Sequence, residues 1–416
     1  MSHSSVSAAV DHGDQTDHFL DITAAGFSFL GPEFRAARQR DWYAWAPTGL
    51  VVTRYQEANA LMRHRNIVFD GQLQLTRNGV HEGPLHEWWS TAMFTAEPAR
   101  HARLRGLLAK SFNARFIEDL QPFTQQSAAQ LAGELATEAG QPVDFCARYA
   151  DRYPAVLVSR VLGVPAADYD LFSRWIKDFS LSLAPNLAEV LPRVDRAVTG
   201  LAEYVADLIE RRRQDRGADL ISALIATAES GDQLSADELH SLVMLLVWGG
   251  IDSAAHQLGQ LLVCFLEEPE QWELLARRPE LVPQAVEEAC RFRTAAFAAP
   301  MYADADIEYR DVHIPAGTFV LIPFGGVNRD PRAFTDPDRF DVTATRSHPP
   351  MLFGGGAHYC LGAALAKMEL AATLGTLTSR FQPPRLAGEI RWTHPLAPIQ
   401  GPDELPVLLT PRSSAG

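Results

Sequence analysis

The sequence lacks three features that mark common classes of protein. No apolar run approaches the roughly 20 residues needed to cross a bilayer, and the N-terminus has no charged and then apolar signal pattern. Cysteine is scarce, and the wide spacing of Cys146, Cys264, Cys290 and Cys360 indicates neither a disulfide framework nor a zinc knuckle. Basic residues are fewer than acidic ones, and a net charge of −14 argues against nucleic acid or an anionic membrane as a partner. We therefore expect a cytoplasmic globular protein.

Composition favours one folded domain. Of the 416 residues, 47% are hydrophobic and 21% are charged, which is ordinary for a globular protein with a large core. No break in composition divides the chain, although its length alone would allow two or three domains. Residues 1–18 are small, polar and rich in His and Asp, so we expect a disordered leader there. A single domain should then occupy residues 19–416.

The segment 351–370 presents Cys360 between a glycine-rich loop and a helical pattern. Residues 362–374 are rich in Ala, Leu and Met and contain no proline, so they should form a helix. The loop residues Gly354 to Gly356 allow backbone conformations that turn amide groups toward the sulfur. Because the thiol precedes a helix N-terminus, we expect its pKa to be lowered.

Three other uses of this segment compete. A nucleotide-binding loop would need G-x-G-x-x-G, and the sixth position here is Tyr359. A zinc site could use His358 and Cys360, but no second Cys/His pair is near. An isolated cysteine is most often buried and inert, and that interpretation stays open for the thiol taken alone.

A second candidate site lies in a long helical pattern. Ser235 and Glu238 form a capping box, and no proline follows until after Glu267. The middle of this stretch is apolar on every side, which predicts a helix that crosses the core. Gly249 and Gly250 lie in this stretch, although each lowers the stability of a helix by about 1 kcal/mol relative to alanine. A backbone distortion or the close approach of a ligand would explain them.

Two polar residues, Asp252 and Ser253, follow these glycines inside the apolar helix. A serine hydroxyl bonded back to a helix carbonyl, with an aspartate at a surface patch, would account for them without any chemical role. Taken alone, the residues leave both interpretations open.

The complete string around the cysteine resembles the haem-binding signature of the bacterial cytochrome P450 monooxygenases. It runs Phe353-Gly354-Gly-Gly-Ala-His358-Tyr-Cys360-Leu-Gly362. The resemblance implies that Cys360 is the thiolate axial ligand of haem iron, a ligand whose electron donation favours O–O cleavage. It also implies that Phe353 packs beside the sulfur and that His358 reaches a haem propionate.

Other segments match the same family in the expected order. Residues 249–253 are similar to its oxygen-binding segment, so that Asp252 and Ser253 would deliver protons, although the family usually has Thr in place of Ser253. His101 and Arg105, one helical turn apart, match the pair that holds haem propionates. We count Asp252, Ser253, Gly249 and Gly250 as catalytic candidates.

Structural motifs of the family are present too. Glu288 and Arg291 match its Glu-x-x-Arg pair, and Arg339 matches the second arginine of that buried triad. Met301 stands where many members have a third propionate-binding arginine. Residues 314–323 have the pattern of a β-hairpin.

The resemblance implies a mainly α (α+β) fold, with haem buried between the long helix and the cysteine helix and a smaller β-rich part. Residues 71–95 show no periodicity and should form a loop that roofs the substrate pocket. By resemblance, the pocket walls come from uncharged residues, namely Trp88, Trp89, Met93, Phe94, Trp248, Ala295, Phe297, Ala298, Leu396 and Ile399.

The implied activity is oxygenation of a mid-sized organic molecule with haem b as cofactor and O2 as co-substrate. Electrons from NAD(P)H would arrive through a ferredoxin and its reductase, which would meet a basic face around Arg103, Lys110 and Lys367. We expect a monomer, and biosynthesis of a specialised metabolite is favoured over catabolism. Two alternatives stay open: a thiolate-haem enzyme of different outcome, such as oxidative coupling, nitration or peroxide use, and a non-catalytic haem protein that recruits a partner enzyme.

Overall fold

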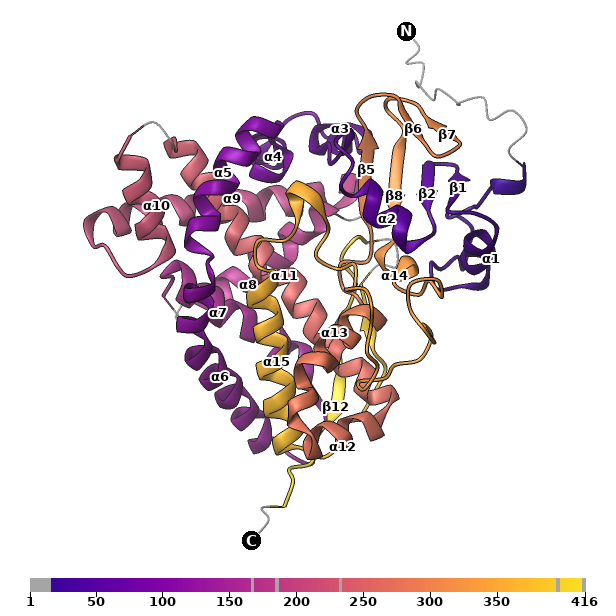
Figure 1. The fold of residues 1–416 in the computed structure, drawn as a ribbon. Coiled ribbons are helices and arrows are strands. Elements are labelled where there is room, and N and C mark those ends of the chain that lie inside the picture. The colour runs from indigo at the N-terminus through magenta and orange to yellow at the C-terminus, as the bar shows by residue number, and fades with distance from the viewer. Residues whose placement is uncertain (1–15, 166–167, 184–186, 232–233, 394–396, 414–416) are drawn as a thin grey trace.

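The computed structural model describes residues 16–413 except 166–167, 184–186, 232–233 and 394–396. Helices form most of the body; β1, β2 and β5 to β8 gather on one side of it, and β12 lies apart from them near α12 (Figure 1). Most of the leader expected over residues 1–18 lies outside the described residues. The described chain starts with a short 3₁₀ turn, Thr16–His18, and Phe19 forms a β-bridge with Trp45.

The central element is helix α11 (Ala236–Glu267), as the sequence predicts. The hydroxyl of Ser235 accepts from the amide of Glu238, and the carboxylate of Glu238 accepts from the amide of Ser235, so the capping box is present. The cysteine helix α15 (Ala363–Arg380) contacts α11 and lies beside α6 (Ala114–Thr137) in Figure 1. These two predicted helices, α11 and α15, enclose the site described below.

The remaining helices pack around this pair. Proline at the first or second position begins several of them, where its missing N–H has no intrahelical partner to lose. Their bounds are α1 Pro32–Arg40, α2 Tyr55–Leu61, α3 Gly71–Arg77, α4 Pro84–Thr91, α5 Pro98–Ser111, α7 Arg152–Leu162, α8 Tyr169–Ser180, α9 Leu187–Gln214, α10 Leu220–Glu229, α12 Pro269–Arg277, α13 Val282–Phe292 and α14 Phe324–Val327, with a π-helical turn η3 at Cys146–Ala150 and short 3₁₀ turns η2 Met93–Thr95, η5 Leu181–Leu183, η6 Pro279–Leu281 and η7 Gly356–His358.

The loop predicted over residues 71–95 is wrong, because this segment forms α3, α4 and η2. Asp70 caps α3 by accepting from the amide of Leu73. In α4, Leu85, Trp88 and Trp89 are all buried. They recur at i, i+3 and i+4, which is helical spacing, but helices this short give too few repeats for the period to be seen.

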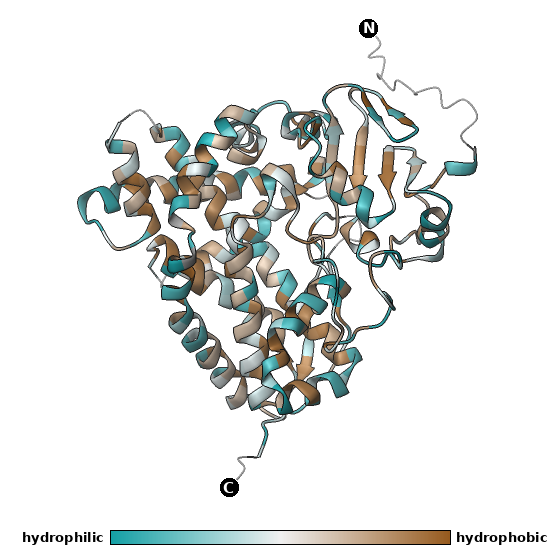
Figure 2. Cartoon of the chain, in the orientation of Figure 1, coloured by the Kyte–Doolittle hydropathy of each residue, from teal (hydrophilic) through white to brown (hydrophobic). Residues whose placement is uncertain are grey.

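The largest sheet has five strands in the order β1-β2-β8-β5-β3, and β2 pairs with β8 in parallel while the other neighbours are antiparallel. Figure 2 shows its strands largely in brown, in keeping with their burial in the core. Three smaller sheets join β4 to β12 and β9, β10 to β11, and β6 to β7. The strand bounds are β1 Tyr43–Ala46, β2 Gly49–Val52, β3 Ile67–Val68, β4 Val143–Asp144, β5 Ala299–Ala303, β6 Ile307–Tyr309, β7 Val312–Ile314, β8 Phe319–Ile322, β9 Arg385–Leu386, β10 Arg391–Trp392, β11 Pro402–Glu404 and β12 Pro406–Leu408.

The hairpin predicted over residues 314–323 is also wrong. A turn is present, since the amide of Thr318 donates to the carbonyl of Pro315 and Gly317 has a φ of 81°. The strands on its two sides nevertheless belong to different sheets: β7 pairs with β6, and β8 pairs with β2 and β5. A local sequence pattern shows where the chain turns, but it does not show with which other strands the two flanking strands will pair.

A buried ionic cluster ties α13 to the cysteine loop. Glu288 and Arg291 have side chains that are each 1% exposed, and two Arg291–Glu288 hydrogen bonds measure 2.8 and 2.7 Å. Arg291 also donates to the carbonyl of Asn328, whose amide group makes two hydrogen bonds with the backbone of Met351. Because Met351 begins the cysteine loop, this cluster anchors the loop in the core.

The second arginine of this cluster is Arg346 rather than Arg339. Arg346 donates to both carboxylate oxygens of Glu288 at 3.0 and 2.6 Å, and its side chain is 14% exposed. Arg339 is 68% exposed and contributes its backbone carbonyl to Arg291 instead. Arg339 closes a turn with Asp336, whereas Arg346 follows a second turn between Asp341 and Ala344, and the sequence motif did not point to Arg346.

Candidate active site

Cys360 lies in a loop whose shape depends on glycine. The amide of Cys360 donates to the carbonyl of Phe353 at 2.8 Å, which closes the loop. Gly354 and Gly356 have φ values of 70° and 60°, in the left-handed region that other residues rarely adopt. Gly362 then begins α15, so the sulfur is held at the N-terminal end of that helix.

The Cys360 side chain borders a cavity of about 470 Å³ between α11 and α15. On the α11 side this cavity is lined by Gly249, Gly250 and Ser253. A Cβ atom added to Gly249 would meet nothing within 4 Å, so the helix surface is open at this point. An adjoining cavity of about 280 Å³ shares the cysteine and both glycines. Together, the two cavities form a slot that separates the thiol from the glycine pair.

The predicted lowering of the Cys360 pKa is wrong for the protein on its own. Burial raises the pKa of the thiol, and this effect outweighs the opposing effects of the Gly362 amide and the Arg105 charge. The amide at the helix end acts in the predicted direction, and the charge of Arg105 adds to it, but the sequence does not show how strongly the surrounding atoms desolvate the sulfur. A cation bound to the sulfur would favour the thiolate form at this position.

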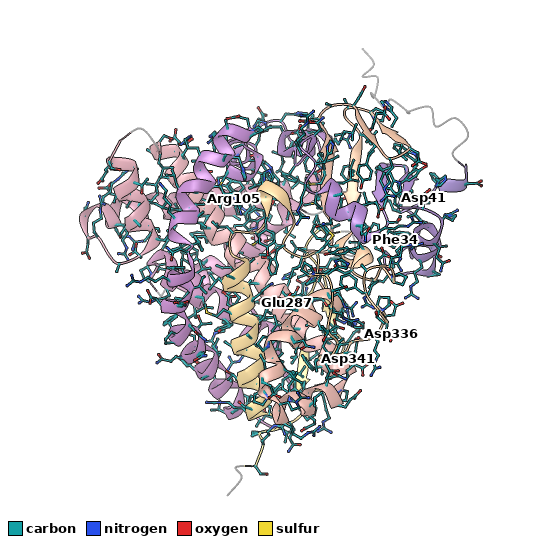
Figure 3. The ribbon with its side chains drawn as sticks, viewed as in Figure 1. Phe34, Asp41, Arg105, Glu287, Asp336 and Asp341 are labelled. Carbon is teal, nitrogen blue, oxygen red and sulfur yellow. The ribbon has the colours of Figure 1, made fainter. Side chains whose placement is uncertain are left out.

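A cluster of nitrogen-bearing side chains lies at one side of the slot. The rings of His101 and His358 are 4.2 Å apart, and Arg105 projects from α5 toward the cysteine loop, where it donates to the carbonyl of Tyr359 (Figure 3). Burial, then His101 and Arg105, lowers the pKa of His358 to about 4, and burial with Arg105 lowers the pKa of His101. None of the ion pairs found among the described residues involves these three side chains.

These features fit haem. Among the described residues no group of three or more His, Cys, Asp or Glu could hold a metal ion. A metal at Cys360 would therefore have to bring its other ligands with it, as iron in a porphyrin does. Arg105 supplies a positive charge, and His101 and His358 supply ring N–H groups. None of the three has an acidic partner in the described chain, and together they would suit the anionic edge of such a group. Met301, which is 5% exposed in β5, adds no donor.

The structure separates the acid and the hydroxyl of the predicted proton-delivery pair. Ser253 lines the larger cavity, and its Oγ donates to the carbonyl of Gly249 at 3.3 Å. Asp252 is half-buried and does not border that cavity. The hydroxyl is therefore placed where a ligand would meet it, whereas the carboxylate is not.

Comparison with known proteins assigns the family. The sequence model of cytochrome P450 matches residues 47–385. This chain belongs to the cytochrome P450 family. It is 37% identical over 393 residues to luteothin monooxygenase of Streptomyces thioluteus, covering 94% of this chain and 95% of that protein. It is also 37% identical over 363 residues to mycinamicin IV hydroxylase/epoxidase of Micromonospora griseorubida, covering 86% and 89%.

Solved structures agree with this assignment. The crystal structure of CalO2 superposes with a TM-score of 0.86 at 27% identity, covering 95% of this chain and 99% of that one. This P450 is therefore a haem-thiolate monooxygenase and an oxidoreductase. Within the described residues, none of its helices is both long and apolar enough to cross a membrane.

Some of the predicted pocket residues of this P450 do line the cavities. Phe94, Trp248 and Ile399 border the larger one, and Met93 borders the smaller one. The indole N–H of Trp248 donates to the hydroxyl of Ser180 at 3.0 Å, which fixes the ring. Leu396 lies outside the described residues.

The other predicted wall residues do not border either cavity. Trp88 and Trp89 are buried in α4, where Trp88 packs behind the wall against Trp248 and Phe94. This follows from the helix that the loop prediction missed, since a helix turns its apolar face into the core.

The segment that leads into β5 is displaced in register from the prediction. Ala296 and Ala299 line the larger cavity, whereas Ala295, Phe297 and Ala298 do not. Phe297 packs against other core residues, among them Phe29. Because side chains of an extended chain alternate between faces, a small error in position exchanges the wall residues for their neighbours.

Two polar residues of the larger cavity were missed. Gln257 donates to the carbonyl of Arg293 and accepts from the amide of Ala295, so it fixes the wall through the backbone. It lies four residues after Ser253 on α11, and this spacing could have identified it. Glu369 of α15 is the other, and it lies four residues after Leu365, which also lines the cavity.

Proposed function

We propose that Cys360 is the axial thiolate ligand of haem b, and that this P450 hydroxylates or epoxidises a mid-sized, mainly apolar organic molecule. The observation that carries the proposal is the slot in which the thiol of Cys360 faces Gly249 and Gly250. Haem, when bound, supplies the iron that activates O2 with electrons from NAD(P)H.

The protein would hold the cofactor from three directions. Cys360 provides the sulfur, and Gly354 shapes the loop that presents it. Phe353 lines the cavity beside that loop and carries the ammonium group of Lys367 at 5.5 Å from its ring. Arg105 would bind the propionates by its charge, and His101 and His358 would bind them by hydrogen bonds, so the propionates would provide the acidic partners that these side chains lack among the described residues.

Ser253 would hold water in the cavity and pass protons to it. Its hydroxyl already borders the cavity, next to the opening at Gly249. Asp252 precedes Ser253 on α11 and is half-buried, so it would take up protons outside the cavity and pass them to the serine. A positioned hydroxyl fed by a carboxylate supplies the acid that the apolar middle of this helix otherwise lacks.

The substrate would be neutral and recognised by shape. The wall near α11 contains Phe69, Phe94, Trp248, Phe324 and Ile399, and no lysine or arginine lines the larger cavity among the described residues. Such a wall offers no partner for an anionic group. Luteothin monooxygenase and the mycinamicin IV enzyme, whose names place them in specialised metabolism, support a biosynthetic role for this chain as well.

Electrons would come from a ferredoxin and its reductase to a cytoplasmic monomer, the usual arrangement for soluble bacterial members of the family. The face predicted for docking carries less net positive charge than its three basic residues suggest, because two of them are paired with acids. Arg103 pairs with Glu238 and Lys367 pairs with Glu287, each at 2.5 Å, and Figure 3 shows Glu287 beside α15. Lys110 is exposed and makes no ion pair within the described residues, so we assign it the main electrostatic role.

The ligand assignment is tested by the spectrum of the reduced protein with carbon monoxide. We expect the red-shifted Soret band of thiolate-ligated haem, and we expect Cys360→His to abolish it. The control is Cys146→Ser, which alters a buried thiol that donates to the carbonyl of Pro402 far from the slot. A wild-type spectrum like that of a histidine-ligated globin would contradict the proposal.

A further inference from the structure

A separate cavity lies next to α7, outside the slot. Its volume is about 630 Å³, which is larger than that of either cavity bordering Cys360. Its walls come from α6, α7, α10 and the chain that leads into α10, and these three helices lie on the left side of Figure 1. We call this space the outer cavity, and the proposed function does not use it.

The walls of the outer cavity are mainly apolar. Three of the lining residues are aliphatic and buried, namely Leu120, Val161 and Leu220. The rings of Phe116 and Phe123 on α6 are half-buried beside them. Apolar surface that faces a cavity is stabilised when an apolar ligand displaces the water from it.

The α10 side of the outer cavity carries mostly small side chains. Ala223 and Ala226 are three residues apart on one face of α10, and both are exposed. Gly217 and Ala218 line the cavity just before that helix begins. The space therefore exists because these positions have almost no side chain to fill it.

Arg160 brings a positive charge to the lining that no acid of the described chain offsets. Its guanidinium group lies 5.7 Å from the centre of the Phe123 ring, and its side chain makes no ion pair among the described residues. Arg216, which also lines the cavity, pairs with Glu229 at 2.5 Å instead. The free guanidinium group thus lies beside an aromatic wall.

Two acids line the outer cavity, and neither pairs with Arg160. Asp219 pairs with Arg212 at 2.8 Å. Asp119 is 3.9 Å from Arg115, and its side chain is 75% exposed, so it lies at the solvent edge. Within the described lining, Arg160 is therefore the charged group that remains available to a ligand, and a guanidinium group is suited to a carboxylate.

Val161 connects the outer cavity with the slot. Among the described residues, it alone lines both the outer cavity and the smaller cavity that borders Cys360. Helix α7 is also packed tightly against α11, since a Cβ atom added to Gly250 would lie 2.8 Å from Cγ2 of Val158. Because a close-packed interior transmits strain, a ligand that presses on α7 would change the space available in the slot.

We propose that the outer cavity is an effector site for an anion with an apolar body, a medium-chain carboxylate. The carboxylate binds Arg160, the apolar body covers the aromatic and aliphatic walls, and occupancy alters ligand binding in the slot through Val161. The larger cavity of the slot has no lysine or arginine in its described lining, so it does not compete for this anion. The inference goes beyond the proposed function, because binding in the outer cavity needs no haem.

The first test is calorimetric titration of the full chain with octanoate, with and without phenylimidazole to fill the slot. Octanoate should bind saturably in both cases. Arg160→Gln should weaken octanoate about tenfold, the low end for a hydrogen bond to a charged group, and leave the binding of octanol unchanged. The matched control is Arg196→Gln, an exposed arginine of α9 outside the lining, which should bind octanoate as the wild type does.

A second variant fills the space without touching the arginine. Ala223 is exposed on α10, so Ala223→Phe should fold normally, which far-ultraviolet circular dichroism checks. Its ring should occupy the outer cavity and abolish the binding of both octanoate and octanol there.

The second test measures coupling in the haem-loaded enzyme. Saturating octanoate should change the dissociation constant of phenylimidazole, read from the difference spectrum, by about fivefold, and phenylimidazole should change that of octanoate by the same factor. Ala223→Phe should remove the effect of octanoate. Val161→Ala, which shortens the side chain shared by the two cavities, should keep octanoate binding and reduce the coupling.

The outcomes separate this inference from the proposed function. A wild type that does not bind octanoate, or an Arg160→Gln variant that binds it equally well, would overturn the inference. Equal affinities for octanoate and octanol would do the same, since Arg160 would then contribute nothing. Binding that leaves the phenylimidazole affinity unchanged would overturn the effector role. A wild type that binds octanoate but lacks the thiolate band with carbon monoxide would overturn the proposed function alone.

Discussion

Replacement of Arg346 by methionine tests the buried cluster that anchors the cysteine loop. In the folded protein, Glu288 accepts two hydrogen bonds from Arg346 and two from Arg291, and its side chain is 1% exposed. Breaking one partner of such a pair typically costs 3 to 5 kcal/mol. Because Arg291 still pairs with the carboxylate and Arg346 is 14% exposed, we expect a loss near the lower limit, about 3 kcal/mol.

The matched control is Arg339→Met, the same change at the residue that the sequence motif indicates. Its side chain is 68% exposed, and its nearest acid, Asp341, is 3.9 Å away. Exposed pairs of this kind contribute less than about 1 kcal/mol. Urea unfolding of both variants, followed by far-ultraviolet circular dichroism and by the Soret band, gives the free energies of unfolding. A loss for Arg339→Met that equals or exceeds the loss for Arg346→Met would refute the reasoning.

The same cluster predicts a dependence on pH. Burial alone would raise the pKa of Glu288, but the hydrogen bonds from Arg291 and Arg346 outweigh it and lower the pKa below 4.5. A lowered pKa stabilises the folded state above the unfolded value, and the contribution is lost as the pH falls through the folded value. The difference between wild type and Arg346→Met should therefore be full at neutral pH and shrink below about pH 4.5.

Three other changes have expected outcomes. Burial raises the pKa of Glu369, so this carboxyl contributes its full stability below about pH 4.5 and loses it as the pH rises toward the pKa of the folded state. In urea unfolding, the free energy of unfolding of Glu369→Gln should therefore increase relative to that of the wild type by up to about 1.4 kcal/mol for each pH unit above this value. Lys110→Gln should slow reduction by ferredoxin at low ionic strength more than Arg103→Gln does, since Glu238 already offsets Arg103; stopped-flow rates that are equal, or that do not depend on salt, would contradict this. Trp248→Ala should enlarge the cavity and give spin shifts with ligands that the wild type excludes, and an unchanged ligand set would show that this ring does not limit the pocket.

The parts of the fold that the sequence predicted are those with local signals. The capping box at Ser235 and Glu238 and the unbroken apolar stretch after it predicted α11 to within one residue at its start. The alanine-rich run after Cys360 predicted α15, because no proline or glycine pair interrupts it before Arg380. In each case the information needed lies within a few turns of the residue concerned.

The parts that were mispredicted depend on what packs against the chain. The sequence motif indicated Arg339 as the partner of Glu288, but the fold buries the side chain of Arg346 and leaves that of Arg339 exposed. Burial likewise decides the direction of the Cys360 pKa shift, although the effect of the helix end was predicted correctly. Glu369 had no recognisable motif at all, and it becomes conspicuous once its surroundings are known to lack a partner.

The two interpretations that the sequence left open for Ser253 describe one and the same contact. Its hydroxyl does bond back to the carbonyl of Gly249, which is the structural explanation, yet it does so at the cavity wall. At 3.3 Å this bond is longer than the usual 2.7–2.8 Å or so for O–H···O, so it is weak and costs little to break. While the bond holds, the serine oxygen can accept a hydrogen bond from water; when it breaks, the hydroxyl can donate to the same water. A serine lacks the methyl group that restricts threonine, so both orientations are accessible, and in the proposed role of Ser253 the back-bond would be its resting position.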